Sequence, residues 1–219
     1  MAYYGKHPEK YSEAERYALA RKLISIVQRK GRVKTEFFGT ENLPKDESGY
    51  MIISNHQGKY DTVGIMAGHD RPCTVLMNKK RSKLPIADQF ITLLSGQRID
   101  SNSIRQQMTV MQNIADEIRD GRVYVVFPEG GYSKRQRNRT SEFKQGCFSC
   151  AIRAECTIVP VAVVDSYIPF NTNSMKEVTT KVIYLPPIPY ESYKDMTSAE
   201  LCAKVKKIID DELEKWPVE

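Results

Sequence analysis

The chain has 219 residues, 41% of them hydrophobic and 27% charged, and its 33 Lys and Arg against 27 Asp and Glu give a formal net charge of +6. This length supports one sizeable hydrophobic core, which excludes a small disulfide-stabilised scaffold. With a mean hydropathy of −0.48, and no apolar run near the ~18 residues of a membrane-spanning helix, we expect no segment that crosses a bilayer.

The first 34 residues carry the excess positive charge, because they hold nine Lys and Arg against three Glu. Ser12 and Glu15 have the spacing of a capping box, and apolar residues recur at helical intervals until Gly31. Residues 12–31 are therefore predicted to form a basic amphipathic helix. Two interpretations stay open: the helix lies in an anionic lipid headgroup layer, or it packs on its own domain.

No secretory signal is visible at this end of the chain. The apolar run over residues 23–27 is too short for the apolar region of such a signal, and no small-residue cleavage pattern follows it. We expect a cytosolic protein whose five cysteines are reduced and serve as small buried apolar groups.

After residue 32, short β-rich runs alternate with longer helical stretches. The predicted strands are residues 33–38, 50–54, 73–77, 98–100, 123–127, 157–163 and 180–185, and the predicted helices are residues 61–67, 84–94, 103–120, 143–154 and 199–214. Residues 165–179 are typical of a long surface loop, and the prolines over 186–189 indicate an extended connection. This order predicts a single α/β domain with a mixed, largely parallel central sheet flanked by helices.

A histidine follows the second predicted strand, in the segment 55–61 with the sequence N-H-Q-G-K-Y-D. His56 is placed at the carboxyl edge of the sheet, where open α/β sheets bind ligands. Asp61, five residues on, can accept a hydrogen bond from one imidazole nitrogen and leave the other as a base. The spacing alone is weak evidence, because a histidine at a strand end is commonly a hydrogen-bonded structural residue.

A glutamate follows the strand predicted at 123–127, in the sequence F-P-E-G-G over residues 127–131. Pro128 stops the strand, and Gly130 and Gly131 let the backbone turn closely around a ligand. Glu129 would then point into the crevice that His56 occupies. Taken alone, this pattern also fits a strand-ending turn with a solvated glutamate.

Together the two clusters resemble the glycerolipid acyltransferases of the 1-acylglycerol-3-phosphate acyltransferase type. That family carries N-H-x-x-x-x-D and, some seventy residues later, F-P-E-G; here His56 and Glu129 are 73 positions apart. The resemblance extends to F-K-Q-G over 143–146 and to V-P-V over 159–161, and it covers about residues 33–190. It implies an N-terminal membrane-associating helix over 1–32 and an acyltransferase domain over 33–219.

The resemblance also implies roles for individual residues. His56 would be the general base for a lysophospholipid hydroxyl, and Asp61 would hold its ring. Glu129 and Gly130 would bind substrate, and Lys144 would bind phosphate. Backbone groups near Gly58 or Gly130 are candidates for stabilising the oxyanion.

Two departures from the family pattern concern cations. Gly131 and Tyr132 occupy positions where the family has Thr and Arg, and Ser101 occupies the position of a second family arginine. We expect Arg98 or Arg105 to substitute, because a guanidinium binds phosphate through two hydrogen bonds. The basic run over 79–83 is typical of a solvated loop.

Several other interpretations are weaker. The apolar stripe of the helix predicted over 84–94 could line an acyl tunnel or simply be core. Cys147, Cys150 and Cys156 lack a second ligand pair at zinc spacing, and no cysteine lies in a recognisable nucleophile turn. No nucleic-acid module is visible, so we expect no nucleic-acid partner. Thioester hydrolysis by the same His and Asp, or a catalytically silent basic membrane-binding protein, remain alternatives.

The sequence thus predicts an enzyme that moves a fatty acyl group from acyl-CoA or acyl-ACP, as co-substrate, to a lysophospholipid. The expected acceptor is lysophosphatidic acid and the product phosphatidic acid, with another lysolipid headgroup as the alternative. We expect no cofactor and no metal. The expected location is the cytoplasm, peripheral on the anionic inner face of the membrane.

Overall fold

The computed structural model describes residues 1–46, 48–133, 136–170 and 176–217. In this part of the chain a seven-stranded sheet has the order β1-β7-β6-β2-β5-β3-β4. Its strands are β1 (Val33–Phe38), β2 (Tyr50–Ser54), β3 (Cys73–Asn78), β4 (Gln97–Ile99), β5 (Val123–Val126), β6 (Thr157–Val164) and β7 (Val178–Tyr184). β6 and β7 pair antiparallel and the other neighbours pair parallel, which confirms the predicted mixed, largely parallel sheet.

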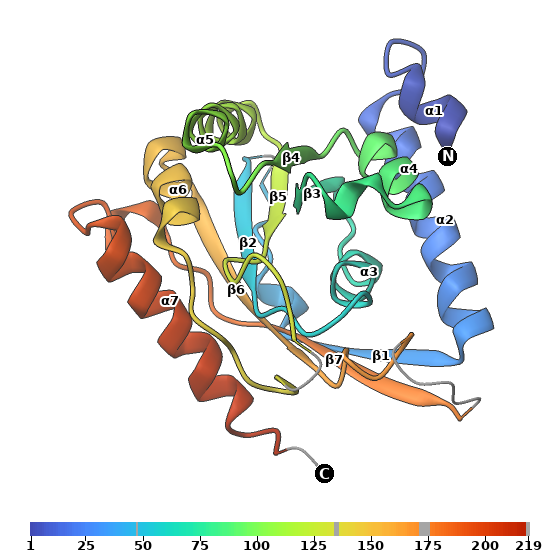
Figure 1. Cartoon of the computed structure of the whole chain (residues 1–219). Helices are drawn as coiled ribbons and strands as arrows, with labels where there is room; N and C mark the ends of the chain where they lie inside the picture. Colours follow the sequence, from blue (N-terminus) through green and yellow to red (C-terminus); the bar gives the residue numbers. More distant parts are fainter. Residues whose placement is uncertain (47, 134–135, 171–175, 218–219) are drawn as a thin grey trace.

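Helices cover both faces of the sheet (Figure 1). They are α1 (Ala2–Lys6), α2 (Glu13–Gly31), α3 (Asp61–Ala67), α4 (Pro85–Leu93), α5 (Ile104–Arg119), α6 (Phe148–Ala154) and α7 (Ser198–Leu213). α2, α3 and α4 lie on one face, and α5, α6 and α7 lie on the other (Figure 1). The predicted single α/β domain is confirmed.

The alternation of side chains along β2 explains the two layers. Met51 and Ile53 belong to the core under α5, α6 and α7, whereas Tyr50 and Ile52 belong to the core under α2, α3 and α4. Every residue of β2 is buried. A strand covered on both faces reads as a continuous apolar run, which is why this strand was evident in the sequence.

Short helices were the main feature that sequence patterns missed. The chain forms 3-10 turns η1 (Thr40–Asn42), η2 (Arg81–Lys83), η3 (Gln145–Cys147) and η4 (Tyr190–Ser192). The helix predicted over 143–154 is therefore shorter, because η3 precedes α6. Of the surface loop predicted over 165–179, residues 171–175 lie outside the described residues, and β7 already begins at Val178.

The N-terminal helix α2 packs on the domain through one face. Its N-terminus has the predicted capping box between Ser12 and Glu15, and Tyr17, Ala20 and Ile24 are buried in the core. Ile26 and Val27 are more than one third exposed. Within the described residues no helix combines the length and apolar character needed to cross a bilayer. Contact of α2 with lipid stays a prediction.

The burial of His69 should make the stability of the protein depend on pH. It is buried, with Nε2 2.6 Å from the Tyr50 hydroxyl and Nδ1 2.7 Å from the Arg71 carbonyl oxygen. Burial lowers the pKa of His69 to about 4, below the ~6.5 of an unfolded histidine. The fold therefore gains its full stability from a neutral His69 above about pH 6.5. As the pH falls to about 4, the free energy of unfolding decreases by about 3 kcal/mol, because the unfolded state binds the proton more tightly.

The experiment is urea unfolding of the wild type and His69→Gln between pH 7 and pH 4. The free-energy difference between the two should shrink by up to about 3 kcal/mol as the pH falls. Other titrating groups are common to both proteins and cancel in this difference. A pH-independent difference would show that His69 is not held neutral by the fold.

Candidate active site

The two clusters predicted at strand ends lie side by side. β2 and β5 are parallel neighbours in which Ile53 pairs with Val126. The residues that follow them, His56 after β2 and Glu129 after β5, consequently emerge at the same edge of the sheet. The backbone N–H of His56 donates to Glu129 Oε1 at 2.8 Å, which links the two clusters directly.

Asp61 holds the imidazole of His56. Asp61 is the first residue of α3 and is fully buried, and its Oδ2 lies 2.6 Å from His56 Nδ1. The same oxygen accepts hydrogen bonds from the backbone N–H of Gln57 at 2.6 Å and of Gly58 at 2.9 Å. With a carboxylate opposite, Nδ1 carries the proton. The other ring nitrogen, Nε2, is left to act as a base.

Two aromatic rings fix the plane of the imidazole. Phe127 stacks on His56 with ring centroids 4.4 Å apart, and Tyr132 meets it edge to face at 4.6 Å. The His56 side chain is 17% exposed and lines a cavity. Among the described residues, no hydrogen bond engages Nε2. The ring therefore presents one unoccupied nitrogen to the cavity.

Glu129 does not line the cavity in the way its sequence position suggested. It is buried, and its Oε2 accepts hydrogen bonds from Ser141, through the backbone N–H at 2.9 Å and the hydroxyl at 2.5 Å, and from the amide of Gln136. Since Oε1 accepts from His56, protein donors engage both carboxylate oxygens. Glu129 thus has a bracing role: its carboxylate links the backbone of His56 to Gln136 and Ser141 through hydrogen bonds.

Two residues that hold the segments of His56 and Glu129 in place were not predicted from the sequence. Asn55 continues the pairing of β2 with β6, since its amide donates to the Val163 carbonyl at 3.0 Å and its oxygen accepts from the Val163 N–H at 2.8 Å. Its signal in the sequence was its place as the first residue of the N-H-x-x-x-x-D motif. Ser141 lies 12 positions from Glu129, and no spacing rule indicates such a contact.

The two glycines considered as oxyanion donors already use their N–H groups. The N–H of Gly58 donates to Asp61, and that of Gly130 donates to the Phe127 carbonyl at 3.0 Å. These two N–H groups are therefore engaged within the protein, and the assignment of oxyanion donors to backbone groups near Gly58 or Gly130 stays a prediction.

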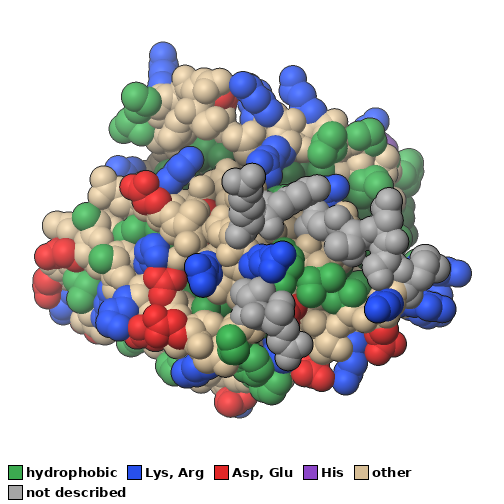
Figure 2. Space-filling view, turned by 60° about the horizontal axis from the view of Figure 1, so that its bottom comes forward, with side chains coloured by type: hydrophobic (Ala, Val, Ile, Leu, Met, Phe, Trp, Pro, Cys, Tyr) green, Lys and Arg blue, Asp and Glu red, His purple; other side chains and the backbone are tan. Residues whose placement is uncertain are grey.

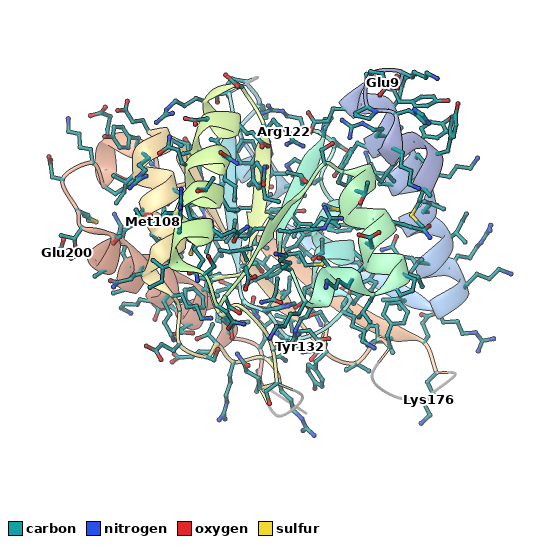
Figure 3. The ribbon with its side chains drawn as sticks, turned by 45° about the horizontal axis from the view of Figure 1, so that its top comes forward. Glu9, Met108, Arg122, Tyr132, Lys176 and Glu200 are labelled. Carbon is teal, nitrogen blue, oxygen red and sulfur yellow. The ribbon has the colours of Figure 1, made fainter. Side chains whose placement is uncertain are left out.

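The cavity in front of His56 has a volume of about 1230 Å³, above the ~300–1,000 Å³ of ordinary small-molecule pockets. Its apolar lining includes Leu23 and Val27 of α2, Val63 of α3, Phe90 of α4 and Met111 of α5. Helices from both faces of the sheet thus contribute to it. Figure 3 labels Met108 of α5 and Tyr132, which also line the cavity. A long apolar chain fits such a space.

The apolar stripe of α4 divides between cavity and core. Leu84, Ala87 and Phe90 line the cavity, while Ile91 and Leu94 are buried in the protein interior. The core interpretation is therefore confirmed for Ile91 and Leu94. An acyl tunnel along the rest of the stripe stays a prediction.

The cations predicted from the sequence as phosphate ligands, Lys144, Arg98 and Arg105, have different surroundings in the structure. Lys144 lines the cavity beside Gly130, which has φ +69°. Arg98 instead bonds to Asp88 Oδ1 at 3.0 Å and Thr92 Oγ1 at 2.7 Å. Neither Arg98 nor Arg105 is among the cavity-lining residues. The side chain of Arg81, in the run predicted to be a solvated loop, does line the cavity.

All five cysteines are buried free thiols, as predicted. Within the part of the chain that the structure describes, no three His, Cys, Asp or Glu side chains gather to hold a metal ion.

Comparisons with known proteins agree on one family. The family model described as "Acyltransferase" matches residues 34–164. The chain is 30% identical over 176 residues to the 1-acyl-sn-glycerol-3-phosphate acyltransferase of Escherichia coli (strain K12), covering 78% of this chain and 70% of that protein. It is 28% identical over 179 residues to 1-acyl-sn-glycerol-3-phosphate acyltransferase alpha of Ovis aries, covering 80% of this chain. The match spans 61% of the length of the Ovis aries protein.

A solved structure has the same fold. The crystal structure of the 1-acyl-sn-glycerophosphate (LPA) acyltransferase PlsC from Thermotoga maritima aligns with a TM-score of 0.76 at 19% identity. The alignment covers 93% of this chain and 81% of that chain. The architecture of the sheet and its flanking helices is thus shared with that protein.

The bracing role of Glu129 can be tested by stability. In Glu129→Gln an NH₂ group replaces one oxygen and faces an N–H donor, so we expect the free energy of unfolding to fall by about 1–3 kcal/mol. Urea unfolding measures this, with the exposed neighbour Glu142→Gln as the matched control. If Glu129→Gln is as stable as the wild type, the bracing role is rejected and a direct contact of Glu129 with substrate is favoured.

Proposed function

Because the chain belongs to the acyltransferase family, we propose that it transfers a fatty acyl group from an acyl thioester, acyl-CoA or acyl-ACP, to the free hydroxyl of lysophosphatidic acid. The product is phosphatidic acid. The observation that carries this proposal is the His56 and Asp61 pair, whose free imidazole nitrogen opens on a large apolar cavity. The relatives named above, all 1-acylglycerol-3-phosphate acyltransferases, support the choice of acceptor.

The proposed reaction needs one base and no covalent enzyme intermediate. His56 Nε2 removes the proton of the acceptor hydroxyl while the oxygen attacks the carbonyl carbon of the thioester. The tetrahedral intermediate then collapses, the carbon–sulfur bond breaks, and the imidazolium returns its proton to the leaving thiolate. Asp61 stabilises the imidazolium through Nδ1 and keeps Nε2 turned toward the cavity.

Holding the two reactants close together and in the right orientation also contributes to the rate enhancement. The apolar lining binds fatty chains by burying them from water, which orients their polar ends toward His56. Phe127 and Tyr132 prevent the ring from rotating away. In this proposal Glu129 is a positioning residue, because its carboxylate holds the general base through the backbone N–H of His56.

The general base can be tested by substitution. His56→Ala should lower turnover with lysophosphatidic acid by about 10²–10⁴-fold while the protein stays folded, because the proton acceptor is lost. The matched control is His7→Ala, which removes a histidine that hydrogen-bonds Glu9 on the N-terminal segment. Product formation is measured with both acyl-CoA and acyl-ACP.

Each rival function gives a different result in that assay. Equal turnover by wild type and His56→Ala would reject His56 as the base. Acylation of lysophosphatidylcholine but not of lysophosphatidic acid would overturn the proposed acceptor. Thioester cleavage that needs no lysolipid would indicate a hydrolase, and vesicle binding without any turnover would indicate a membrane-binding protein.

We also propose peripheral association with an anionic membrane. Exposed apolar side chains surround the cavity: Leu84 is 62% exposed, Ile86 78%, Ile104 78% and Met108 61%. A cluster of large apolar groups around an opening is typical of an interaction surface. Figure 2 shows Lys and Arg side chains together with hydrophobic, Asp and Glu side chains on the face that it presents. The Lys and Arg side chains would attract anionic headgroups.

The membrane proposal predicts that Ile86→Ser combined with Ile104→Ser weakens sedimentation with vesicles that contain phosphatidylglycerol. Two exposed apolar side chains would no longer enter the lipid, so we expect at least about a tenfold loss of affinity. Phe38→Ser is the control, because Phe38 is 42% exposed but does not line the cavity. Equal losses for both proteins would exclude a specific docking role for the cavity rim.

A further inference from the structure

The C-terminal half of α2 is attached to the domain through Tyr60. The last buried residue of α2 is Ile24. One turn further on, the side-chain amide of Gln28 donates to the Tyr60 hydroxyl at 2.8 Å and to Thr35 Oγ1 at 3.2 Å. A polar contact with these two residues therefore fixes this end of the helix, where apolar burial no longer does.

Tyr60 is fully buried where α2, β1 and β7 meet. Its hydroxyl lies 2.7 Å from Thr35 Oγ1 of β1, which in turn lies 3.0 Å from Thr180 Oγ1 of β7. Burial raises the pKa of Tyr60, so its hydroxyl stays protonated at neutral pH and can both donate and accept. The helix and the sheet therefore hold this hydroxyl together.

The first turn of α3 fixes the other end of Tyr60. Tyr60 is the N-cap residue of α3, and its carbonyl accepts a hydrogen bond from the Gly64 N–H at 2.8 Å. A Cβ built on Gly64 would lie 3.3 Å from Tyr60 Cε1, so the ring packs directly on this turn. The side chain of Tyr60 thus spans from α2 to the start of α3.

The next residue of the chain is Asp61, whose carboxylate is held from one side. Its Oδ2 accepts hydrogen bonds from His56 and from the backbone of residues 57–58. Its Oδ1 is buried and has no hydrogen-bond partner among the described residues. The orientation of the carboxylate therefore depends on the backbone that leads into it from Tyr60.

We propose that Tyr60 is a positioning residue for the pair of His56 and Asp61, and that its hydroxyl couples the position of α2 to the orientation of Asp61. This inference rests on the proposed acyl transfer, in which His56 is the base. The same helix supplies Leu23 and Val27 to the lining of the cavity. The hydroxyl of Tyr60 thus keeps this part of the cavity wall and the base in one arrangement.

Tyr60→Phe removes the hydroxyl and keeps the ring. We expect kcat with lysophosphatidic acid to fall about 10-fold, because a small displacement of a catalytic group lowers the rate. KM should change less than about twofold, since the residues that line the cavity are unaltered.

Tyr193→Phe is the matched control for the loss of a buried hydroxyl. Tyr193 is buried in the core under α5, α6 and α7, and its hydroxyl donates to the Ala151 carbonyl at 3.3 Å. This variant should keep the wild-type kcat. Equal losses of kcat in Tyr60→Phe and Tyr193→Phe would show a general effect of lost stability and would overturn the positioning role.

Gln28→Leu tests the other end of the connection, on α2. If Gln28 acts through Tyr60, this variant should also lower kcat, and the double variant Gln28→Leu with Tyr60→Phe should lose no more than Tyr60→Phe alone. A loss in the double variant equal to the product of the two single losses would show that the residues act independently, which contradicts the coupling.

Proton NMR separates this inference from the proposed reaction. The proton on His56 Nδ1 lies in a hydrogen bond of 2.6 Å to Asp61, and imidazole protons in such bonds resonate far downfield of other N–H groups. His56→Ala, which lacks this proton, identifies the resonance. We expect the resonance to be unchanged in Tyr193→Phe, and to move upfield or to broaden by exchange with water in Tyr60→Phe.

The two measurements can fail separately. An unaltered resonance in Tyr60→Phe would overturn the coupling, whatever the kcat of this variant. A resonance that Tyr60→Phe alters, in a protein whose wild type has no turnover, would reject only the reaction. Turnover by the wild type, with kcat and resonance both unaffected by Tyr60→Phe, would reject only the coupling.

Discussion

The hydrogen bonds accepted by the buried carboxylate of Asp61 are the interaction on which the rest of the site depends. One oxygen accepts from the imidazole of His56 and from the backbone N–H groups of Gln57 and Gly58. The same contact therefore shapes the turn after β2 and selects the tautomer of the ring. Because a helix N-terminus favours negative charge, the start of α3 is a suitable place for this carboxylate.

The carboxylate of Glu129 also accepts hydrogen bonds, but these join two loops of the site. The parallel pairing of β2 with β5 brings two loops together, but loops that share only an edge can still shift against each other. Glu129 joins them by accepting from the His56 N–H and from Ser141 on the following segment. One carboxylate thus orients the ring of His56 and the other holds its backbone, so the two acidic residues of the motifs have separate mechanical roles.

The distribution of cations shows why position along the chain is a weak guide to a binding surface. Arg98 stands close to the place in sequence where a phosphate ligand is expected, yet Asp88 and Thr92 hold it outside the cavity. Arg81 comes from a run that has the composition of a solvated loop, and η2 directs it to Tyr132. Replacement of an arginine by Tyr132 and the approach of Arg81 are compatible because the aromatic face attracts the guanidinium.

The sequence by itself determined the strands, the largely parallel sheet, the family and the pairing of His56 with Asp61. The strands and the His56–Asp61 pair depend on local periodicity or on residues a few positions apart, the sheet on the order of its elements, and the family on motifs whose spacing is read directly from the sequence. Only the tertiary structure decided that Glu129 turns toward Ser141, that the stripe of α4 divides between cavity and core, and that Arg81 lines the cavity. Those outcomes depend on how helices and loops remote in sequence pack against one edge of the sheet, and side-chain direction there follows from the space and partners that packing leaves.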